Sequence, residues 1–221
     1  MNLNLIKSYI ERFILDLDSW LEESQFLWRH YQRFGNHWTL DTPDLKPMIL
    51  DCCDQNVALW YADHHYPIES LVTYIGHNQE MIRSTFSDLY DQRKELSGRV
   101  DRFLFHIDWI QKDYNKSTLR HTMHYHDIGL CLRYLSMRYP QVYAFYHRES
   151  FDKFLLGVQA KQVSNVSRID RFVKVSNIIK KLLTEEILKR DTMPVALAPI
   201  IQDYPMILVY LYYREASERY C

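Results

Sequence analysis

Apolar residues recur at three- and four-residue steps along most of this 221-residue chain, which is the spacing of helices that bury one face. Residues 2–34 follow it most regularly and predict one long amphipathic helix or a close pair, ended by Gly35. Asp44 or Thr42 can cap the helix after the next loop. Helices are expected over 47–62, from Pro67 to Ile75 with Gly76 closing it, from Asn78 onward, from Ser97 to before Asn115, from Ile128 to before Tyr139, over 167–190 and over 200–219.

Strict alternation of apolar and polar residues, the pattern of a half-buried strand, is nearly absent from the chain. Residues 141–146 are the only short candidate. The chain also holds only five glycines, fewer than a sheet protein with many tight turns uses. The sequence therefore predicts an all-α fold: a single multi-helix globular domain of about eight to ten helices over residues 1–221.

Charge is distributed unevenly along the chain, although the net charge is only −1. Residues 1–115 hold 11 Lys/Arg against 18 Asp/Glu, whereas residues 116–190 hold 14 against 6 and residues 191–221 hold 2 against 4. We expect the domain to consist of this acidic half, a basic and aromatic-rich half, and a C-terminal helix over 200–219. A basic half suits an anionic partner, but cations that merely solvate helix faces give the same pattern.

Cysteine usage and hydropathy indicate the compartment. The four cysteines include the adjacent pair Cys52 and Cys53 and no C-x-x-C, so they form neither a disulfide framework nor a zinc motif. The N-terminus carries Glu11 within its apolar pattern, unlike a secretory signal, and no run reaches eighteen apolar residues. The expected protein is soluble and cytoplasmic, with no membrane contact.

Two weak patterns suggest enzymes. The doublet His126-Asp127, with His106 upstream and Asp152 or Asp170 downstream, loosely resembles the metal ligands of HD phosphohydrolases. That resemblance implies a metal ion that activates water.

The second pattern pairs Arg120 with His126, a spacing similar to that of HEPN nucleases, where the histidine is the acid/base and the arginine stabilises phosphate charge. Asp127 as a helix N-cap is the structural alternative. No phosphate loop and no nucleophile motif occurs. We therefore expect no enzymatic activity, no catalytic residue, no metal and no cofactor.

The basic half offers a nucleic-acid surface instead. Arg168, Arg171, Lys174 and Lys181 recur at helical spacing, so one helix face can present a row of cations to phosphates. In the stretch 124–155, aromatic residues are interleaved with arginine, lysine and histidine. Tyr143 and Tyr146 can stack on bases there, or they can fill a core.

Several segments taken in order resemble the N-terminal regions of McrB-like AAA+ restriction proteins. They are GRVDRFLFHID, HYHDIGLCLRYLSMRYPQVYAFYHRESFDKFL, RIDRFVKVSNIIKKLLTEE and ILVYLYY, with the best agreement in YLSMRYPQVYAFY. The resemblance covers residues 80–215 and implies a module that recognises DNA for a GTP-using motor. The sequence contains no phosphate loop like that of the motor, so the resemblance does not imply GTPase activity. Two explanations stay open: the chain is a fragment of a longer protein, or it is a stand-alone relative of these N-terminal regions.

The leading hypothesis is a non-enzymatic helical module that binds nucleic acid, with DNA as the expected partner, for a restriction or anti-phage defence system. An AAA+ motor in cis or trans is a further expected partner. One alternative is a protein-interaction or oligomerisation module in which the acidic half meets the basic half of another copy, and another is the HD-type phosphohydrolase. The residues expected to bind nucleic acid are Arg138, Tyr143, Tyr146, Arg148, Lys153, Lys161, Arg168, Arg171 and Lys174.

Overall fold

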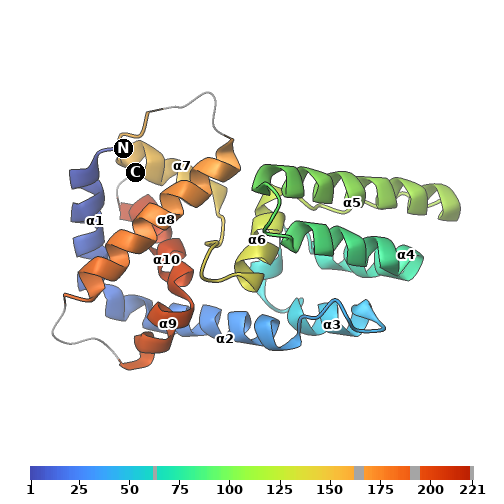
Figure 1. Cartoon of the computed structure of the whole chain (residues 1–221), viewed down its shortest axis with the longest axis horizontal. Coiled ribbons are helices and arrows are strands. Elements are labelled where there is room, and N and C mark those ends of the chain that lie inside the picture. Colours follow the sequence, from blue (N-terminus) through green and yellow to red (C-terminus); the bar gives the residue numbers. More distant parts are fainter. Residues whose placement is uncertain (62–63, 162–166, 190–194, 220–221) are drawn as a thin grey trace. The chain divides into compact units, whose positions relative to one another are not determined.

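The computed structural model describes residues 1–61, 64–161, 167–189 and 195–219 (Figure 1). Within these ranges the chain forms ten α-helices and three short 3-10 helices, and no described residue lies in an extended strand. The predicted all-α fold of eight to ten helices is confirmed. The candidate strand at 141–146 was wrong, because this segment is an irregular connection between two helices.

The contacts group the chain into two compact units, where the sequence predicts one domain. Unit 1 comprises residues 1–31 and 139–221, and unit 2 comprises residues 32–138. Unit 1 thus joins the two ends of the chain. The predicted acidic and basic halves do not follow this division.

Unit 2 is built around a helical hairpin. The helices α4 (Pro67–Tyr90) and α5 (Leu96–Thr118) lie antiparallel and side by side (Figure 1), and α6 (Ile128–Arg138) packs against both. The ring of Tyr134, on α6, is fully buried at the centre of the unit. It lies 5.0–6.2 Å, centroid to centroid, from four other rings: Trp38, Trp60, Phe86 and Phe103. The other elements of unit 2 are α3 (Leu45–Cys52), which packs on α4, η2 (Ala58–Trp60) and the C-terminal part of α2 (Leu21–His37).

Unit 1 is built around α10 (Pro205–Arg219), which packs against α1 (Leu3–Leu15), α7 (Arg148–Gly157), α8 (Arg168–Ile187) and α9 (Ala198–Asp203). Its two adjacent tyrosines, Tyr212 and Tyr213, are buried, and both rings lie near Phe154 of α7. The Tyr212 ring meets Phe13 of α1 at 5.8 Å, and the Tyr213 ring meets Phe154 of α7 at 4.9 Å. The unit is completed by η1 (Leu17–Trp20), η3 (Val195–Leu197) and the N-terminal part of α2.

The helix boundaries settle one sequence prediction and correct two. Of the two alternatives expected over residues 2–34, the close pair is confirmed as two α-helices separated by η1, whereas Gly35 lies inside α2 rather than after it. The helix expected over 200–219 is interrupted at Tyr204, because Pro205 has no N–H and disfavours a helical conformation in the preceding residue. The helix expected over 167–190 is confirmed as α8.

Membrane-spanning potential is limited among the described residues. No single helix there combines the length and the apolar composition needed to cross a bilayer. The helical segments Val195–Asp203 and Pro205–Glu218, which are bent by 104° relative to each other, reach this length and apolar composition only when they are taken together. Its second helix supplies buried core residues to unit 1, including Met206, Val209 and Leu211.

Candidate nucleic-acid interface

The first turns of α7 and α8 meet at one carboxylate. Asp152 Oδ2 lies 3.7 Å from Arg148 Nε, on the same helix, and 3.4 Å from Arg168 Nη2 on α8. The two arginine side chains are 73% and 46% exposed. Two guanidinium groups thus share a single negative charge at the surface of unit 1, which leaves a local excess of positive charge.

Side-chain caps fix where these two helices begin. His147 Nδ1 accepts hydrogen bonds from the Ser150 N–H at 3.3 Å and the Ser150 hydroxyl at 2.9 Å. Ser167 Oγ accepts from the Asp170 N–H at 3.0 Å, and its hydroxyl donates to the Asp170 carboxylate at 2.6 Å. Each cap leaves an arginine as the first helical residue. A cation there opposes the helix dipole, so helix formation alone does not favour these arginines.

The predicted row of cations lies on the outer face of α8. Lys174 is exposed and makes no ion pair with any described residue, whereas Lys181 has Glu185 at 3.8 Å. Arg171 is half-buried, and its Nη2 donates to the Lys161 carbonyl at 2.8 Å, which brings the exposed Lys161 beside α8. Together with Arg148 and Arg168, these cations form what we call the α7–α8 basic surface, defined as Arg148, Lys161, Arg168, Arg171 and Lys174.

The two tyrosines expected to stack on bases are buried instead. Tyr143 and Tyr146 each have an exposed fraction of only 6%. The Tyr146 ring packs edge-on against Phe172 of α8 at 4.8 Å and against Phe151 of α7 at 6.3 Å. Neither tyrosine offers a ring face to a base, because both rings fill the core beneath the connection from α6 to α7.

The other two predicted positions lie apart from the α7–α8 basic surface as defined. Arg138 is exposed at the end of α6 and belongs to unit 2. Lys153 pairs with Glu149 along α7 at 2.9 Å and lines a polar pocket of about 240 Å³ between α7 and α10. The pocket also contains Arg214, which pairs with Glu23 and with Glu218. Its cations are therefore matched by carboxylates, and it presents no excess positive charge.

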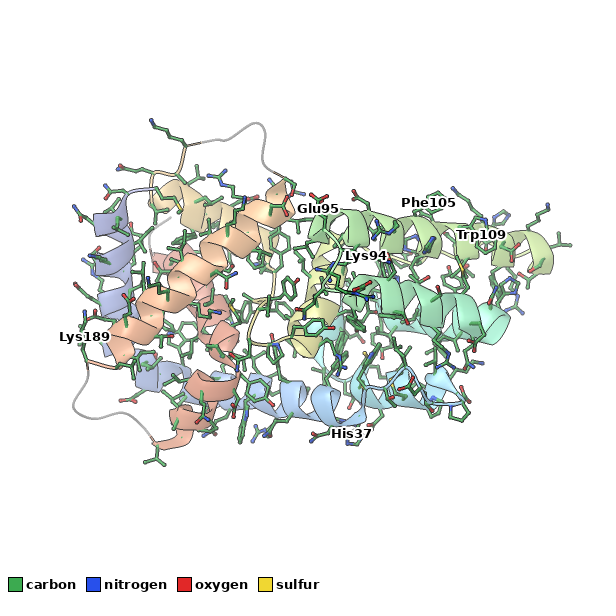
Figure 2. All side chains as sticks on the ribbon, in the orientation of Figure 1. His37, Lys94, Glu95, Phe105, Trp109 and Lys189 are labelled. Atoms are coloured by element: carbon green, nitrogen blue, oxygen red, sulfur yellow. The ribbon has the colours of Figure 1, made fainter. Side chains whose placement is uncertain are left out.

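An exposed aromatic pair on α5 escaped the sequence reading. Phe105 is 64% exposed and Trp109 is 45% exposed, and Figure 2 shows both on the side of α5 away from α4. The buried stripe of α5 consists of Phe103, Ile107, Ile110 and Tyr114. Steps of four, three and four residues define that stripe, so this spacing could have placed Phe105 and Trp109 outside it.

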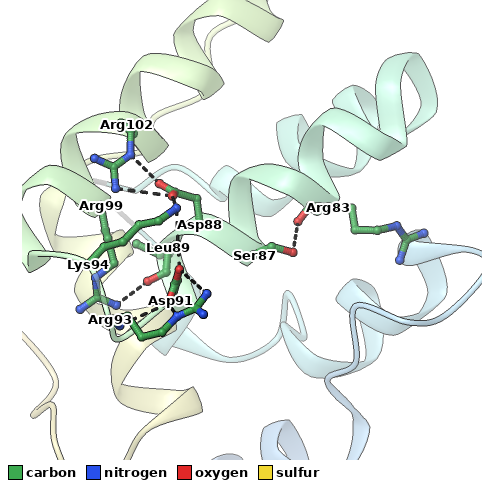
Figure 3. Close-up of polar contacts among 9 residues, drawn as sticks. All are labelled: Arg83, Ser87, Asp88, Leu89, Asp91, Arg93, Lys94, Arg99 and Arg102. Atoms are coloured by element: carbon green, nitrogen blue, oxygen red, sulfur yellow. Dashed lines mark hydrogen bonds and ion pairs between the residues drawn. The ribbon is translucent and has the colours of Figure 1, made fainter.

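At the turn between α4 and α5, arginine and lysine side chains pair with neighbouring aspartates (Figure 3). The Asp88 carboxylate forms ion pairs with Lys94 and with Arg102, the latter at 2.7 Å. The Asp91 carboxylate forms an ion pair with Arg93 at 2.8 Å. The hydrogen bond from Arg93 lowers the pKa of Asp91 to about 2. Arg99 is buried, and its Nη1 donates to the Leu89 carbonyl at 2.7 Å. These cations brace the α4–α5 turn and do not form an open basic surface.

Known proteins supply no model for this arrangement. Comparisons with protein-family models, with curated proteins and with solved structures find no match. The resemblance to McrB-like proteins therefore stays a prediction.

Two residues of the enzyme-like patterns, His126 and Asp127, have structural roles in unit 2. His126 is 7% exposed, and its Nδ1 lies 2.9 Å from the His124 carbonyl. Burial, with a smaller contribution from His124, lowers the pKa of His126 to about 3. Asp127 accepts the Leu130 N–H at 2.8 Å, as the N-cap alternative predicted. The described residues contain no cluster of three or more potential metal ligands.

Proposed function

We propose that this protein is a non-enzymatic module that binds nucleic acid, with duplex DNA as the first ligand to test, through the α7–α8 basic surface. The observation that carries the proposal is that Arg148 of α7 and Arg168 of α8 share the single carboxylate of Asp152, while Arg171 holds Lys161 beside α8 and Lys174 is exposed on the same helix. Arginine offers a planar fork of donors that suits phosphate, and phosphates supply the continuous negative charge that such a surface complements.

The proposed mechanism is phosphate neutralisation without base stacking at this surface. Because Tyr143 and Tyr146 are buried, the affinity here is expected to depend little on sequence. Each phosphate contact releases condensed counterions, so affinity should fall steeply as salt rises. The service to an McrB-like motor or another defence system belongs to the same proposal and rests on the sequence resemblance alone. The proposed cytoplasmic location rests on the cysteine usage and the hydropathy of the sequence.

Fluorescence anisotropy with labelled duplex DNA, single-stranded DNA and RNA at several salt concentrations tests the proposal. We expect salt-dependent binding that Lys174→Glu weakens, with a salt slope shallower by about one. Lys174 suits this test because it makes no ion pair with a described residue. The matched control is Lys116→Glu, the same charge change at an exposed position in unit 2. Binding that ignores salt, or equal loss in both variants, would contradict the proposal.

A second candidate function is self-association through the aromatic pair on α5. The sequence predicted self-association between an acidic half and a basic half of two copies. The compact units do not have opposite charges of this kind, because unit 1 holds 15 Lys/Arg against 14 Asp/Glu and unit 2 holds 12 against 14. Phe105 and Trp109 instead offer an apolar patch, flanked by Asp101 and Lys112. An antiparallel pairing of two α5 helices about residues 106–107 would bring those opposite charges together.

Sedimentation of the full chain over a concentration series separates the two functions. Association through apolar side chains should persist at high salt, unlike phosphate binding. Trp109→Ala should shift the equilibrium to monomer, whereas Leu156→Ala, at an exposed leucine of α7, should not. A monomer at every concentration counts against this second candidate.

A further inference from the structure

The connection from α5 to α6, residues 119–127, contains no helix and is held to unit 2 by side chains at two places. The first place is Thr122. Its N–H donates to Asn115 Oδ1 at 3.0 Å, and its carbonyl accepts from Asn115 Nδ2 at 3.2 Å and from Gln111. Its hydroxyl lies 3.1 Å from the Tyr74 hydroxyl. Amide and hydroxyl groups take up no proton at mildly acidic pH, so this anchor does not depend on pH.

The second place consists of two histidines. The His126 N–H donates to His124 Nδ1 at 2.9 Å, and this bond requires an Nδ1 without a proton. His124 Nε2 therefore carries the ring proton and donates it to Asp108 Oδ1, on α5, at 2.6 Å. The Ser70 hydroxyl, on α4, donates to the His124 carbonyl at 3.2 Å. These are the bonds of a neutral ring, because a proton on Nδ1 would set two donors against each other.

The surroundings of the two rings disfavour protonation in place. The His126 side chain is buried, and its ring centroid lies 5.5 Å from that of His124, so two charged rings would repel each other. Asp108 favours a proton on His124 and opposes this effect, whereas burial keeps Tyr134, beside His126, neutral by raising its pKa well above its usual range. Tyr125, between the histidines, has a left-handed φ of 54°, which costs free energy that release of the segment would return.

We propose that residues 123–127 form an acid-released strap, whose two histidines take up protons and leave their places on unit 2 while Thr122 holds one end. At the other end, Asp127 stays fixed as the N-cap of α6. The released strap binds more protons than the fixed one, so release is favoured as pH falls below about 6.5, the ordinary pKa of histidine. For His126 alone, the released population should rise about 25-fold between about pH 7 and pH 5. Release uncovers the rings of Phe103 and Tyr134, against which His126 packs.

Amide hydrogen exchange of the full chain, followed by NMR and corrected for the intrinsic exchange rate at each pH, tests the strap. The N–H groups of Thr122 and His126 are both bonded to side-chain acceptors, so each serves as a reference for the other. We expect the protection of the His126 N–H to fall about 25-fold between about pH 7 and pH 5, while that of the Thr122 N–H stays unchanged. An equal change at the two amides, or no change at His126, overturns the proposal.

Three variants assign the response to the strap. His126→Phe keeps a buried ring that takes up no proton, and it should remove most of the pH response at the amide of residue 126. His77→Asn is the matched control, because it breaks the other histidine–aspartate pair on α5, with Asp113 at 2.7 Å, and should keep the full response. A response that survives in His126→Phe, or one that His77→Asn removes, contradicts the strap.

The third variant decides the matter even where His126→Phe does not fold. Asp108→Asn keeps an acceptor for His124 Nε2 but removes the negative charge that opposes release. The fall in protection at His126 between about pH 7 and pH 5 should become larger in this variant than in the natural chain. A smaller fall would overturn the proposal.

Discussion

At the scale of single residues, burial changes the chemistry that the sequence offers. His126 is the histidine that both enzyme-like patterns share, yet its ring lies inside unit 2 against Phe103 and Tyr134. Its Nδ1 must carry the proton, because the His124 carbonyl beside it can only accept a hydrogen bond. Its Nε2 then faces the Tyr134 hydroxyl at 3.4 Å. Both nitrogens of the neutral ring therefore have a hydrogen-bond partner. Protonation of the ring would place a positive charge in a buried position.

This leads to a prediction for stability against pH. The His126 pKa is about 3 in the folded chain and about 6.5 when unfolded. Between those values the unfolded state binds the extra proton, so stability is full above about pH 6.5 and falls as pH falls. His126 should account for a loss of roughly 2 kcal/mol between about pH 7 and pH 5.

Urea unfolding of the natural chain and of His126→Asn across this pH range checks the prediction. The variant is expected to be less stable at pH 7 but to lose about 2 kcal/mol less on acidification. His121→Asn, at an exposed histidine of the same segment, is the control. Parallel pH profiles for the natural chain and His126→Asn would show that His126 is not the group responsible.

At the scale of the element, a single polar residue can set where a new helical segment begins. The helix α4 contains one residue with non-helical angles, Asn78, at φ −151° and ψ 83°. Its side-chain oxygen accepts the Met81 N–H at 3.0 Å, which is the bond of an N-cap. The element is therefore two helical segments joined at a cap, as the sequence predicted from Asn78, and Pro67 occupies the first position of the first segment.

Removing this internal cap should destabilise the protein. Asn78→Ala is expected to lower the free energy of unfolding by about 1 kcal/mol, because the Met81 N–H loses its partner. Ser84→Ala, at an exposed position in the second segment of α4, provides the comparison and should leave stability unchanged or slightly higher. Chemical denaturation of both variants gives the two values. If the two substitutions cost the same, the Asn78 bond is not acting as a cap.

At the scale of the whole molecule, each unit has its own core. The aromatic cluster around Tyr134 lies wholly within residues 32–138, which form one uninterrupted piece of chain. Unit 1 is assembled from both ends of the chain, so the acidic N-terminal helices join the basic helices α7 and α8. The uneven charge along the sequence is thereby largely evened out between the units.

The division predicts that a fragment of residues 32–138 folds by itself. Its helix content by circular dichroism and a cooperative urea transition are the measurements. Tyr134→Ala in the same fragment should abolish or greatly weaken the transition, since about 3–5 kcal/mol is typical for removing a buried aromatic side chain. A fragment without a cooperative transition would mean that unit 2 depends on the rest of the chain.

The sequence by itself determined the local features of this protein. The all-α class, the Asp44, Asn78 and Asp127 caps, and the cationic row on α8 all follow from signals within a few residues of each other. A cap needs only its own side chain and the next turn's N–H groups, and helical spacing needs only the geometry of one helix. Such features can be read without knowing what lies elsewhere.

Only the tertiary structure decided which aromatic residues are exposed to solvent and which charged residues pair with one another. Phe105 and Trp109 are exposed while Tyr143 and Tyr146 are buried, although all four belong to aromatic-rich segments. Burial depends on neighbours far along the chain, such as Phe172 against Tyr146, and no local pattern contains them. The same holds for charge: Arg168 meets Asp152 of another helix, a pairing that only the packing of α7 against α8 creates.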